Sequence, residues 1–275
     1  MNITFRKYQG TGNDFIIIDD RNNNFPQENR SLIETLCNRR FGIGADGLIL
    51  LQNHADGDFY MQYFNSDGNE SSMCGNGGRC IAQFAFDQGI AKNTTTFYAV
   101  DGIHTAKSTN GTNNEKIINL QMCDVGDIEI AEESICILNT GSPHYVSFKT
   151  EPVDTIDLVN QARLIRYNDE YKEKGINVNF VNLKGLKSIA VRTYERGVED
   201  ETFSCGTGAT ASALATAIFN NLPGGMHQIN VNVKGGDLKV QFNFEKNPAR
   251  FTNVWLQGPA VLVFQGSLNI DSENI

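Results

Sequence analysis

Hydrophobic and polar positions along the chain follow two different periods, which predict many strands and a few helices. Apolar residues at every second position, or in short continuous runs, predict strands, whereas apolar residues three and four positions apart predict helices. The first half has helical spacing at 31–37, with Ser31 as the N-cap, and at 78–88, closed by Gly89. Strands are predicted at 3–8, 15–19, 47–51, 59–64, 95–100 and 104–108.

The second half repeats this plan after a polar stretch at 109–115, whose Asn110-Gly111 pair is typical of a hairpin. Helices are predicted at 156–165 and 209–220. Strands are predicted at 117–122, 134–139, 145–148, 177–183, 187–194, 229–233, 237–244, 254–257 and 261–264. A length of 275 residues fits two domains of ordinary size, so we expect one domain at 1–115 and a second at 116–260.

Each half contains one cysteine at a Gly-rich turn that leads into a predicted helix. Cys74 is followed by Gly75-Asn76-Gly77, and Cys205 is followed by Gly206-Thr207-Gly208. Both belong to a strand–loop–cysteine–helix unit, and such matched units indicate an internal duplication. A duplicated fold whose halves face each other would direct both thiols to one point.

Composition places the protein among soluble globular proteins. Of its residues, 40% are hydrophobic and 20% are charged. The net charge of −9 argues against nucleic acid or an anionic membrane as the main partner. No apolar run approaches the ~18 residues of a membrane span, and the N-terminal residues lack the features of a secretory signal. We therefore expect a cytoplasmic protein whose six cysteines remain thiols.

No metal or organic cofactor is expected. The chain has no Cys-x-x-Cys pair, and its four histidines lack the spacing of metal ligands. The segment 42–47 matches G-x-G-x-x-G, but it follows a predicted helix and opens none, so we reject it as a dinucleotide site. There is no P-loop and no lysine in a setting typical of a Schiff base.

The cysteine turns predict acid–base chemistry. A thiol at a helix N-terminus experiences the positive end of the dipole, which lowers a thiol pKa from its ordinary value of about 8.5. The N–H groups of the first turn also bind anions such as a carboxylate. Two thiols on opposite sides of one carbon can invert a stereocentre by moving its proton. The simpler alternative is two ordinary Gly-rich turns with incidental cysteines, but two turns at matched positions favour function.

Several polar residues near predicted strand ends are candidate substrate contacts. Glu195 would bind an ammonium group and Arg196 a distal carboxylate, although a solvated ion pair is an equally simple interpretation. His144 would polarise a thiol or bind substrate. The side-chain amides that suit a zwitterion, or equally a turn, are those of Asn13, Asn65 and Asn177.

Six motifs in order resemble the diaminopimelate epimerase family, over residues 1 to about 268. They are Thr11-Gly12-Asn13-Asp14-Phe15, Phe64-Asn65-Ser66-Asp67-Gly68, Met73-Cys74-Gly75-Asn76-Gly77-Gly78-Arg79-Cys80, Gly141-Ser142-Pro143-His144, Tyr194-Glu195-Arg196-Gly197 and Ser204-Cys205-Gly206-Thr207-Gly208-Ala209. The resemblance implies an α+β fold of two pseudo-symmetric domains, each a curled mixed sheet around a central helix, with the site in the cleft between them. It also implies that the C-terminal strand region 261–275 completes the first domain.

The same resemblance implies a cofactor-free isomerase that interconverts LL- and meso-diaminopimelate for lysine and peptidoglycan precursors, as a homodimer in the cytoplasm. Cys74 and Cys205 would be the acid–base pair, with His144 and Glu195 assisting. The backbone amides of Gly75-Asn76 and Gly206-Thr207 would hold the reacting carboxylate. The remaining substrate contacts would be Asn13, Asn65, Asn177, Glu195 and Arg196.

Two positions depart from the family pattern. Ser142 stands where the family usually has Asn, and Gly47 stands where a Gln is common. Both departures are expected to loosen the grip on the distal end of the substrate, and neither affects the cysteines.

Three other readings remain open. A related two-cysteine racemase would act on proline or hydroxyproline, but such relatives usually have His where this chain has Asn76. A dithiol redox protein would prefer a Cys-x-x-Cys pair. A binding module would keep its function after Cys74→Ala.

Overall fold

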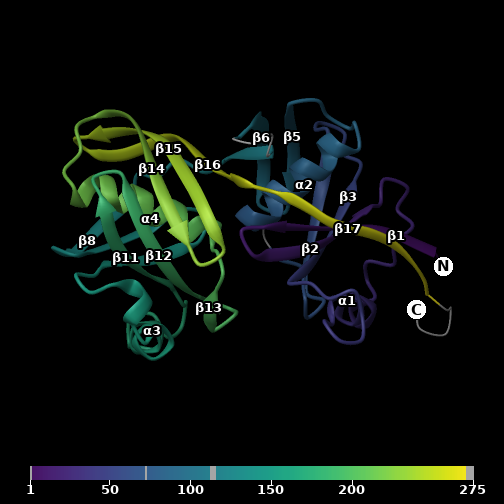
Figure 1. Ribbon diagram of the computed structural model, residues 1–275, viewed down its shortest axis with the longest axis horizontal. Helices are drawn as coiled ribbons and strands as arrows, with labels where there is room; N and C mark the ends of the chain where they lie inside the picture. Colours follow the sequence, from purple (N-terminus) through teal and green to yellow (C-terminus); the bar gives the residue numbers. More distant parts are fainter. Residues whose placement is uncertain (1, 72, 112–115, 271–275) are drawn as a thin grey trace. The chain divides into compact units, whose positions relative to one another are not determined.

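The computed structural model describes residues 2–71, 73–111 and 116–270 (Figure 1). The chain separates into two compact units. The first unit comprises Met1–Leu120 and Pro259–Ile275, and the second comprises Gln121–Gly258. Each unit is described by itself below. The strand that follows the polar stretch at 109–115 is hydrogen-bonded to the strand before it, and it lies in the first unit as far as Leu120.

The first unit is a mixed sheet with two helices. Its β1 and β17 are antiparallel, so a segment from near the C-terminal end borders the N-terminal strand. From β1 the pairing continues antiparallel to β2, parallel to β3, antiparallel to β4, parallel to β5, and antiparallel to β6 and β7. The elements are β1 (Asn2–Gly10), β2 (Asn13–Asp19), α1 (Arg30–Cys37), β3 (Gly47–Gln52), β4 (Phe59–Asn65), α2 (Gly75–Asp87), β5 (Thr94–Ala99), β6 (Gly102–Asn110), β7 (Lys116–Gln121) and β17 (Val261–Asn269).

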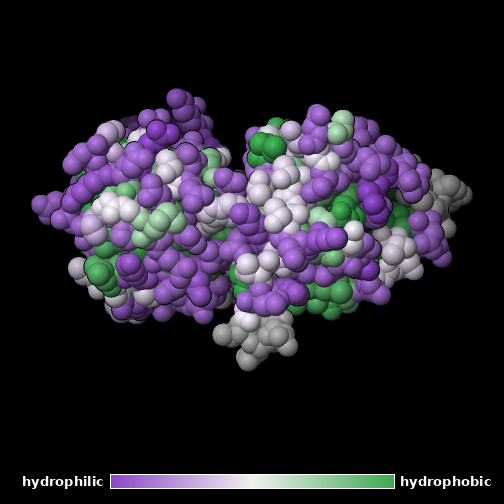
Figure 2. All heavy atoms as spheres, turned by 90° about the horizontal axis from the view of Figure 1, so that it is seen from above, coloured by the Kyte–Doolittle hydropathy of each residue, from purple (hydrophilic) through white to green (hydrophobic). Residues whose placement is uncertain are grey.

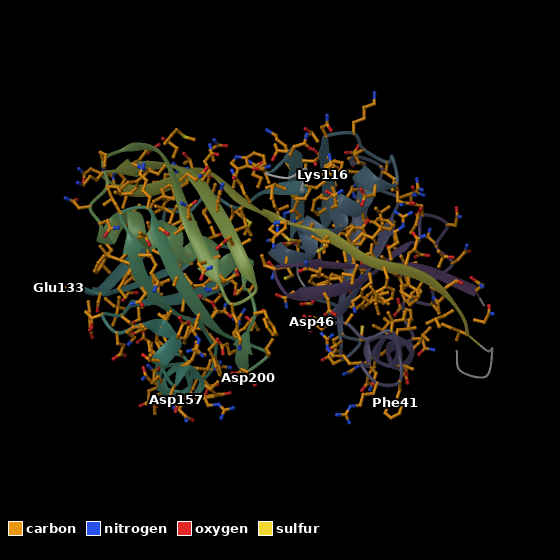
Figure 3. The ribbon with its side chains drawn as sticks, in the orientation of Figure 1. Phe41, Asp46, Lys116, Glu133, Asp157 and Asp200 are labelled. Carbon is orange, nitrogen blue, oxygen red and sulfur yellow. The ribbon has the colours of Figure 1, made fainter. Side chains whose placement is uncertain are left out.

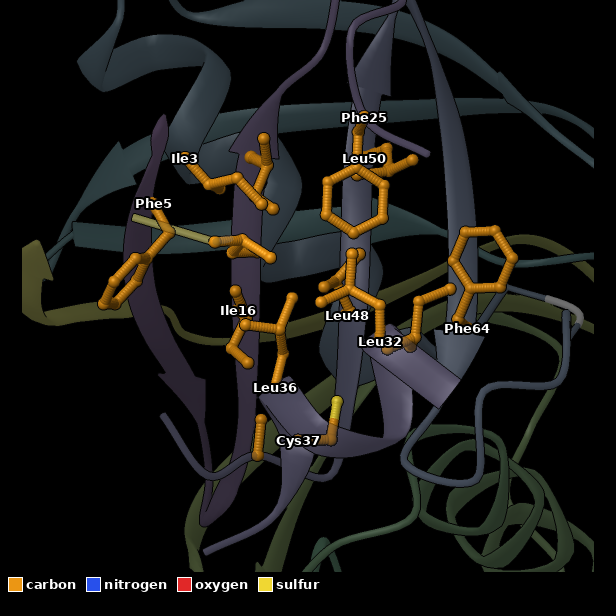
Figure 4. Close-up of a cluster of buried hydrophobic side chains, with 14 residues drawn as sticks. Ile3, Phe5, Ile16, Phe25, Leu32, Leu36, Cys37, Leu48, Leu50 and Phe64 are labelled. Carbon is orange, nitrogen blue, oxygen red and sulfur yellow. The ribbon is translucent and has the colours of Figure 1, made fainter. Parts of the chain in front are cut away.

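The two helices of this unit differ in how much of their surface is buried. The amphipathic helix α1 buries only one side, with Leu32, Ile33 and Leu36 in a cluster that also contains side chains of β1 to β4 (Figure 4). The helix α2 is buried over Gly75–Ala85 and packs against β1, β2, β3, β6 and β17. A curled sheet therefore surrounds α2, and the start of this helix is held in place from several sides.

The second unit has the same architecture. The antiparallel pairs β8–β9 and β9–β10 lead to a parallel β10–β11, an antiparallel β11–β12, a parallel β12–β14 and the antiparallel β14–β15 and β15–β16. The elements are β8 (Ile128–Glu132), β9 (Ile135–Asn139), β10 (Pro143–Phe148), a 3-10 turn (Val153–Thr155), α3 (Leu158–Arg166), β11 (Asn177–Gly185), β12 (Ser188–Glu195), β13 (Asp200–Thr202), α4 (Gly206–Phe219), β14 (Gly225–Val233), β15 (Gly236–Lys246) and β16 (Ala249–Pro259).

The helix α4 is the counterpart of α2. Its small residues allow close approach, so Gly206 and the run from Gly208 to Ala217 are buried, and the helix packs against β9 to β12, β14 and β15 (Figure 1). In each unit one helix lies in sequence between the two strands of the first parallel pair, and a buried helix lies between the two strands of the second. The predicted fold class, two α+β domains with curled mixed sheets around a central helix, is confirmed.

Some local predictions were wrong. Ser31 lies inside α1, and the N-cap is Asn29, whose side chain accepts a hydrogen bond from the N–H of Leu32. The helices α2 and α4 begin at Gly75 and Gly206, three residues earlier than predicted, because burial overrides the low helix propensity of glycine. The short strands β8 and β13 were not predicted.

Candidate active site

Cys74 is the N-cap of α2. Its backbone is extended, with φ −92° and ψ 131°, and the first hydrogen bond of the helix runs from the N–H of Gly78 to the carbonyl of Cys74, at 2.7 Å. The N–H groups of Gly75, Asn76 and Gly77 precede that bond, so the helix itself does not use them. The thiol and three amide donors thus share the positive end of a buried helix.

Cys205 has the same place on α4. It is the N-cap, with φ −112° and ψ 112°, and its carbonyl accepts the N–H of Ala209 at 2.8 Å. Its Sγ lies 3.3 Å from Oγ1 of Thr207, whose carbonyl accepts a hydrogen bond from the Thr140 hydroxyl at 2.9 Å. Cys205 is 7% exposed, whereas Cys74 is half-buried. The two turns therefore match in backbone and differ in surroundings.

A chain of amides fixes the Cys74 turn. Nδ2 of Asn76 donates to Oδ1 of Asn13 at 2.6 Å, and Nδ2 of Asn13 donates to Oδ2 of Asp46 at 2.9 Å. Asp46, labelled in Figure 3, also accepts a hydrogen bond from Arg39 at 2.7 Å. The structure therefore brings the predicted residues Asn13 and Asn76 together beside Cys74, and it adds Asp46, which sequence reasoning missed.

Behind this chain lies an ion-pair network. Asp14 receives two hydrogen bonds from Arg39, at 2.9 and 2.7 Å, and lies 2.9 Å from Nζ of Lys7. Burial alone would raise the pKa of Asp14, but hydrogen bonds from Arg39 and Lys7 outweigh it and lower the pKa to about 2. Asp14 is therefore charged at neutral pH and anchors the start of β2 next to Asn13.

Asn65 and Gly47 lie opposite each other, at the end of β4 and the start of β3. The side chain of Asn65 is exposed. A Cβ added to Gly47 would lie 2.5 Å from the carbonyl oxygen of Phe64 and 2.5 Å from Cε2 of Tyr63. The ring of Tyr63 therefore fills the space where a side chain at position 47 would begin, so the absence of Gln there leaves no gap beside Gly47.

His144 is fully buried beside the Cys205 turn. Its Nδ1 accepts a hydrogen bond from Nδ2 of Asn179 at 3.0 Å, which places the proton of the neutral ring on Nε2. Among the described residues no hydrogen-bond partner reaches that Nε2. Burial, reinforced by the charge of Arg196, lowers the pKa of His144 to about 3 although the bond to Asn179 opposes the shift. His144 is therefore a neutral N–H donor at physiological pH.

Gly208 is the point where His144 and Cys205 meet. A Cβ on Gly208 would lie 2.4 Å from Oδ1 of Asn179, 3.3 Å from Cβ of Cys205 and 3.3 Å from Cε1 of His144. Asn179 also accepts the hydroxyl of Thr193 and donates to the carbonyl of Tyr145, so its amide is fixed. Sequence reasoning missed Asn179, although a polar residue between Val178 and Phe180 in an apolar strand was a usable signal.

Asn177 joins two predicted site segments. Its Nδ2 donates to Oγ of Ser142 at 2.6 Å and to the carbonyl of Pro143 at 3.0 Å, while its Oδ1 accepts the N–H of Arg196 at 2.9 Å. The side chain of Arg196 is directed along the surface, with one nitrogen 3.0 Å from the carbonyl of Lys174. Ser142 thus has a partner within the protein, and Glu195, half-buried at the end of β12, directly precedes Arg196.

The described residues contain no group of three or more His, Cys, Asp or Glu side chains placed to hold a metal ion. The predicted site residues form two separate clusters, one in each unit. Cys74, Asn76 and Asn13 are connected in the first, with Asn65 on a neighbouring strand end. Cys205, Thr207 and His144 surround Gly208 in the second, and Asn177 connects the His144 turn to Arg196.

A family model described as diaminopimelate epimerase matches residues 5–124 and 136–263. Curated relatives carry the same description. The chain is 51% identical to the Flavobacterium psychrophilum protein over 95% of this chain and 98% of that one. It is 36% identical to the Aquifex aeolicus protein, over 96% and 97% of the two chains.

Solved structures with low sequence identity share the fold. A PhzF-family phenazine biosynthesis protein of Bacillus anthracis superposes with a TM-score of 0.74 at 14% identity, covering 98% of this chain and 100% of that one. A hydroxyproline epimerase of Agrobacterium vitis superposes with a TM-score of 0.70 at 13% identity, covering 98% and 93%.

Proposed function

The chain belongs to the diaminopimelate epimerase family, an isomerase family of lysine biosynthesis, and on this premise we propose that Cys74 and Cys205 interconvert LL- and meso-diaminopimelate by a two-base mechanism. The observation that carries the proposal is the pair of cysteines that cap matched, buried helices. In this scheme both thiols act on one substrate carbon, from opposite faces.

The proton balance of the reaction needs only the two sulfur atoms. The thiolate of one cysteine takes the α-proton, which breaks the C–H bond and leaves the electron pair on the substrate as an enolate-like anion. The thiol of the other cysteine then gives its proton to the opposite face and becomes the thiolate. The enzyme ends with one thiol and one thiolate, as it began, with their positions exchanged, and the reverse reaction uses them in the opposite order.

The helix N-termini stabilise the anion that forms in between. The amides of Gly75-Asn76 and Gly206-Thr207 lie at the positive ends of α2 and α4, where developing negative charge on the α-carboxylate is favoured. His144 assists as a neutral donor through Nε2, because its low pKa keeps it uncharged. These groups supply the acid, the base and the electrostatic stabilisation, so the scheme assigns no step to a metal or organic cofactor.

The remaining predicted contacts would hold the two ends of the substrate. We assign Asn13 and Asn65 from the first unit and Asn177, Glu195 and Arg196 from the second. Arg196 and Glu195 provide one positive and one negative group at the end of β12, which suits the carboxylate and ammonium of an amino acid. Asn177 acts mainly by positioning, since its amide bonds lie within the protein.

The setting of the enzyme follows from the same proposal. The product supplies lysine and peptidoglycan precursor synthesis, a cytoplasmic role. No helix in the described ranges is long and apolar enough to cross a membrane. The surface seen in Figure 2 is mostly hydrophilic, with hydrophobic residues in small patches.

A homodimer is part of the proposal. The strand β17 exposes a run of apolar side chains, with exposed fractions of 40% for Val261, 41% for Leu262, 55% for Val263 and 46% for Phe264. Burial of such a run against a second copy would remove it from water. Light scattering on purified protein should give twice the 30.4 kDa of one chain, and a mass of 30.4 kDa would contradict the dimer.

The decisive experiment is incubation of the purified protein with LL-diaminopimelate in D₂O without added cofactor. We expect meso-diaminopimelate with deuterium at the inverted α-carbon. Proline and hydroxyproline serve as control substrates. Inversion of these instead of diaminopimelate would favour the related racemase activity, and inversion without deuterium would exclude proton transfer through an exchangeable thiol.

A further inference from the structure

Arg79 is a fully buried cation one turn into α2. Its exposed fraction is 0%, and among the described residues the acceptors of its guanidinium are neutral. These are the carbonyl of Gly75 at 3.3 Å, Oγ1 of Thr11 at 3.1 Å and the carbonyl of Pro259 at 3.4 Å. A guanidinium stays protonated even when burial lowers its pKa, as it does here. A permanent positive charge therefore lies one turn from the start of α2.

No carboxylate in the described part of the first unit forms an ion pair with Arg79. Asp14, on β2, is paired with Lys7 and Arg39. Asp101, just before β6, is paired with His104 at 3.1 Å. Asp87, at the far end of α2, accepts hydrogen bonds from Tyr8 and Gln83. The strands β3 and β17 carry no titratable side chain.

Two cysteines are close in sequence to Arg79: Cys74, the N-cap of α2, and Cys80, the next residue in the helix. A thiolate at either position would raise the pKa of Arg79, against the effect of burial. Cys80 does not supply the negative charge, because burial raises its pKa to about 12 and it remains a thiol. Cys74 is half-buried at the N-cap, at the same end of the helix as the Gly75 carbonyl that Arg79 contacts. A buried charge without a counter-ion is costly, so the thiolate of Cys74 is the natural partner.

We infer that Arg79 is the positioning residue that holds Cys74 as the thiolate, and that Cys74 is therefore the sulfur that carries the negative charge in the substrate-free enzyme. The inference rests on the proposed function only in giving Cys74 the role of resting base. The second unit has no such residue, because Thr210 stands at the position five after its cysteine. The hydroxyl of Thr210 donates to the carbonyl of Gly206, within its own helix.

A purely structural role for Arg79 predicts different behaviour. In that case its bonds to Thr11 and Pro259 would fasten the β1–β2 turn and the segment before β17 to α2. Loss of those bonds would lower the stability of the protein without changing the acidity of Cys74. The two roles are separated by measuring the ionisation of Cys74 directly.

The experiment follows the rate of iodoacetamide alkylation of Cys74 between pH 5 and 10, quantified on the Cys74 peptide by mass spectrometry. The experiment compares three proteins: Cys205→Ala, and the same protein with Arg79→Lys or with Arg79→Gln. Circular dichroism verifies that each of them is folded. For Arg79→Gln we expect the midpoint to rise by at least about one pH unit and the rate at pH 7 to fall at least about tenfold. Arg79→Lys keeps the charge and should stay within about threefold of the parent protein.

An unchanged midpoint in Arg79→Gln would overturn the inference. In a Cys74→Ala background the alkylation profile of Cys205 serves as the control, and Arg79→Gln should leave it in place. An Arg79→Gln shift of equal size at both cysteines would also overturn the inference. The D₂O assay is independent of this result, since failure to invert diaminopimelate would refute the proposed function without moving the Cys74 midpoint.

A second measurement leaves Arg79 intact and applies if its variants do not fold. A thiol whose pKa is lowered in the folded state contributes stability above its unfolded pKa, and that stability is lost as pH falls through the folded pKa. The difference in urea midpoint between the parent protein and Cys74→Ala should therefore widen in favour of the parent from pH 6 to pH 9. A constant difference over this range would overturn the inference.

Discussion

The helices α2 and α4 begin alike, but the side chains beneath them are of opposite kinds. The parallel pairs place Phe15 beside Gly47 in the first unit and His144 beside Asn177 in the second. Phe15 on β2 therefore corresponds in the first unit to His144 on β10 in the second. Ile49 and Asn179, each two residues further along its strand, correspond in the same way.

The contacts of the two helices confirm the correspondence. A Cβ on Gly77 would meet Ile49, Met61 and Phe15, all apolar, whereas a Cβ on Gly208 would meet Asn179 and His144. Beneath the start of α2 the side chains are therefore apolar, and Arg79 is a buried cation within the helix. Beneath the start of α4 the side chains are the neutral hydrogen-bonding groups of His144 and Asn179. The duplicated backbone places a cysteine at the N-cap of a buried helix twice, and the side chains beneath the two helices differ in polarity.

The largest effect is expected from removing either thiol. Cys74→Ala and Cys205→Ala should each lower the rate of inversion by on the order of 10³-fold, because each removes one proton carrier. Circular dichroism controls for folding. Inversion at a near-normal rate in either variant would contradict the two-base scheme, since the remaining sulfur would then serve both faces of the substrate carbon.

His144 should make the stability of the second unit fall at acid pH. Phe15, at the corresponding position of the first unit, does not titrate and has no such effect. The pKa of His144 is about 3 in the folded protein and about 6.5 when unfolded, so the unfolded state binds more protons between these values. Stability contributed by the neutral ring is present above about pH 6.5 and is lost as pH falls toward 3, by up to about 1.4 kcal/mol per pH unit.

The measurement is urea unfolding of the parent protein and His144→Gln from pH 7 to 4. The parent should show the steeper loss of stability. Parallel curves would mean that His144 is not held neutral by the fold. The carboxyl of Asp14 loses its contribution at lower pH, as pH falls from about 4 through about 2, so the two effects separate.

The smallest effect is expected from a matched pair of glycine substitutions. Gly208→Ala places a methyl group 2.4 Å from the fixed Oδ1 of Asn179, and we expect a loss of about 1–3 kcal/mol. Gly77→Ala meets only movable ends of side chains, at 3.3 Å or more, and its gain in helix propensity of about 1 kcal/mol should offset the contact. Urea midpoints measure the stability of both variants. Equal losses of stability would contradict the difference in packing beneath the two helices.

The sequence predicted the strands, the helices and both cysteine turns well, because these depend on local periodicity and on glycine. It misplaced the starts of α2 and α4, since the surrounding sheet, and not helix propensity, decides where each begins. Asp46 and Asn179 were missed because their importance arises from contacts between strands far apart in the chain. Arg79 was read only as part of a motif, since nothing local reveals that it is buried without a carboxylate partner.

The pairing of β17 with β1 has a consequence for biosynthesis. The strand that borders β1 is made after every strand of the second unit, whereas β8, in the corresponding place beside β9, is made just before its neighbour. During synthesis on the ribosome, all strands of the second unit are therefore made before β17. Until β17 is made, β1 lacks its partner at one edge of the first unit's sheet. Newly made chains spend this interval with an unpaired β1 edge, the kind of surface that chaperones shield.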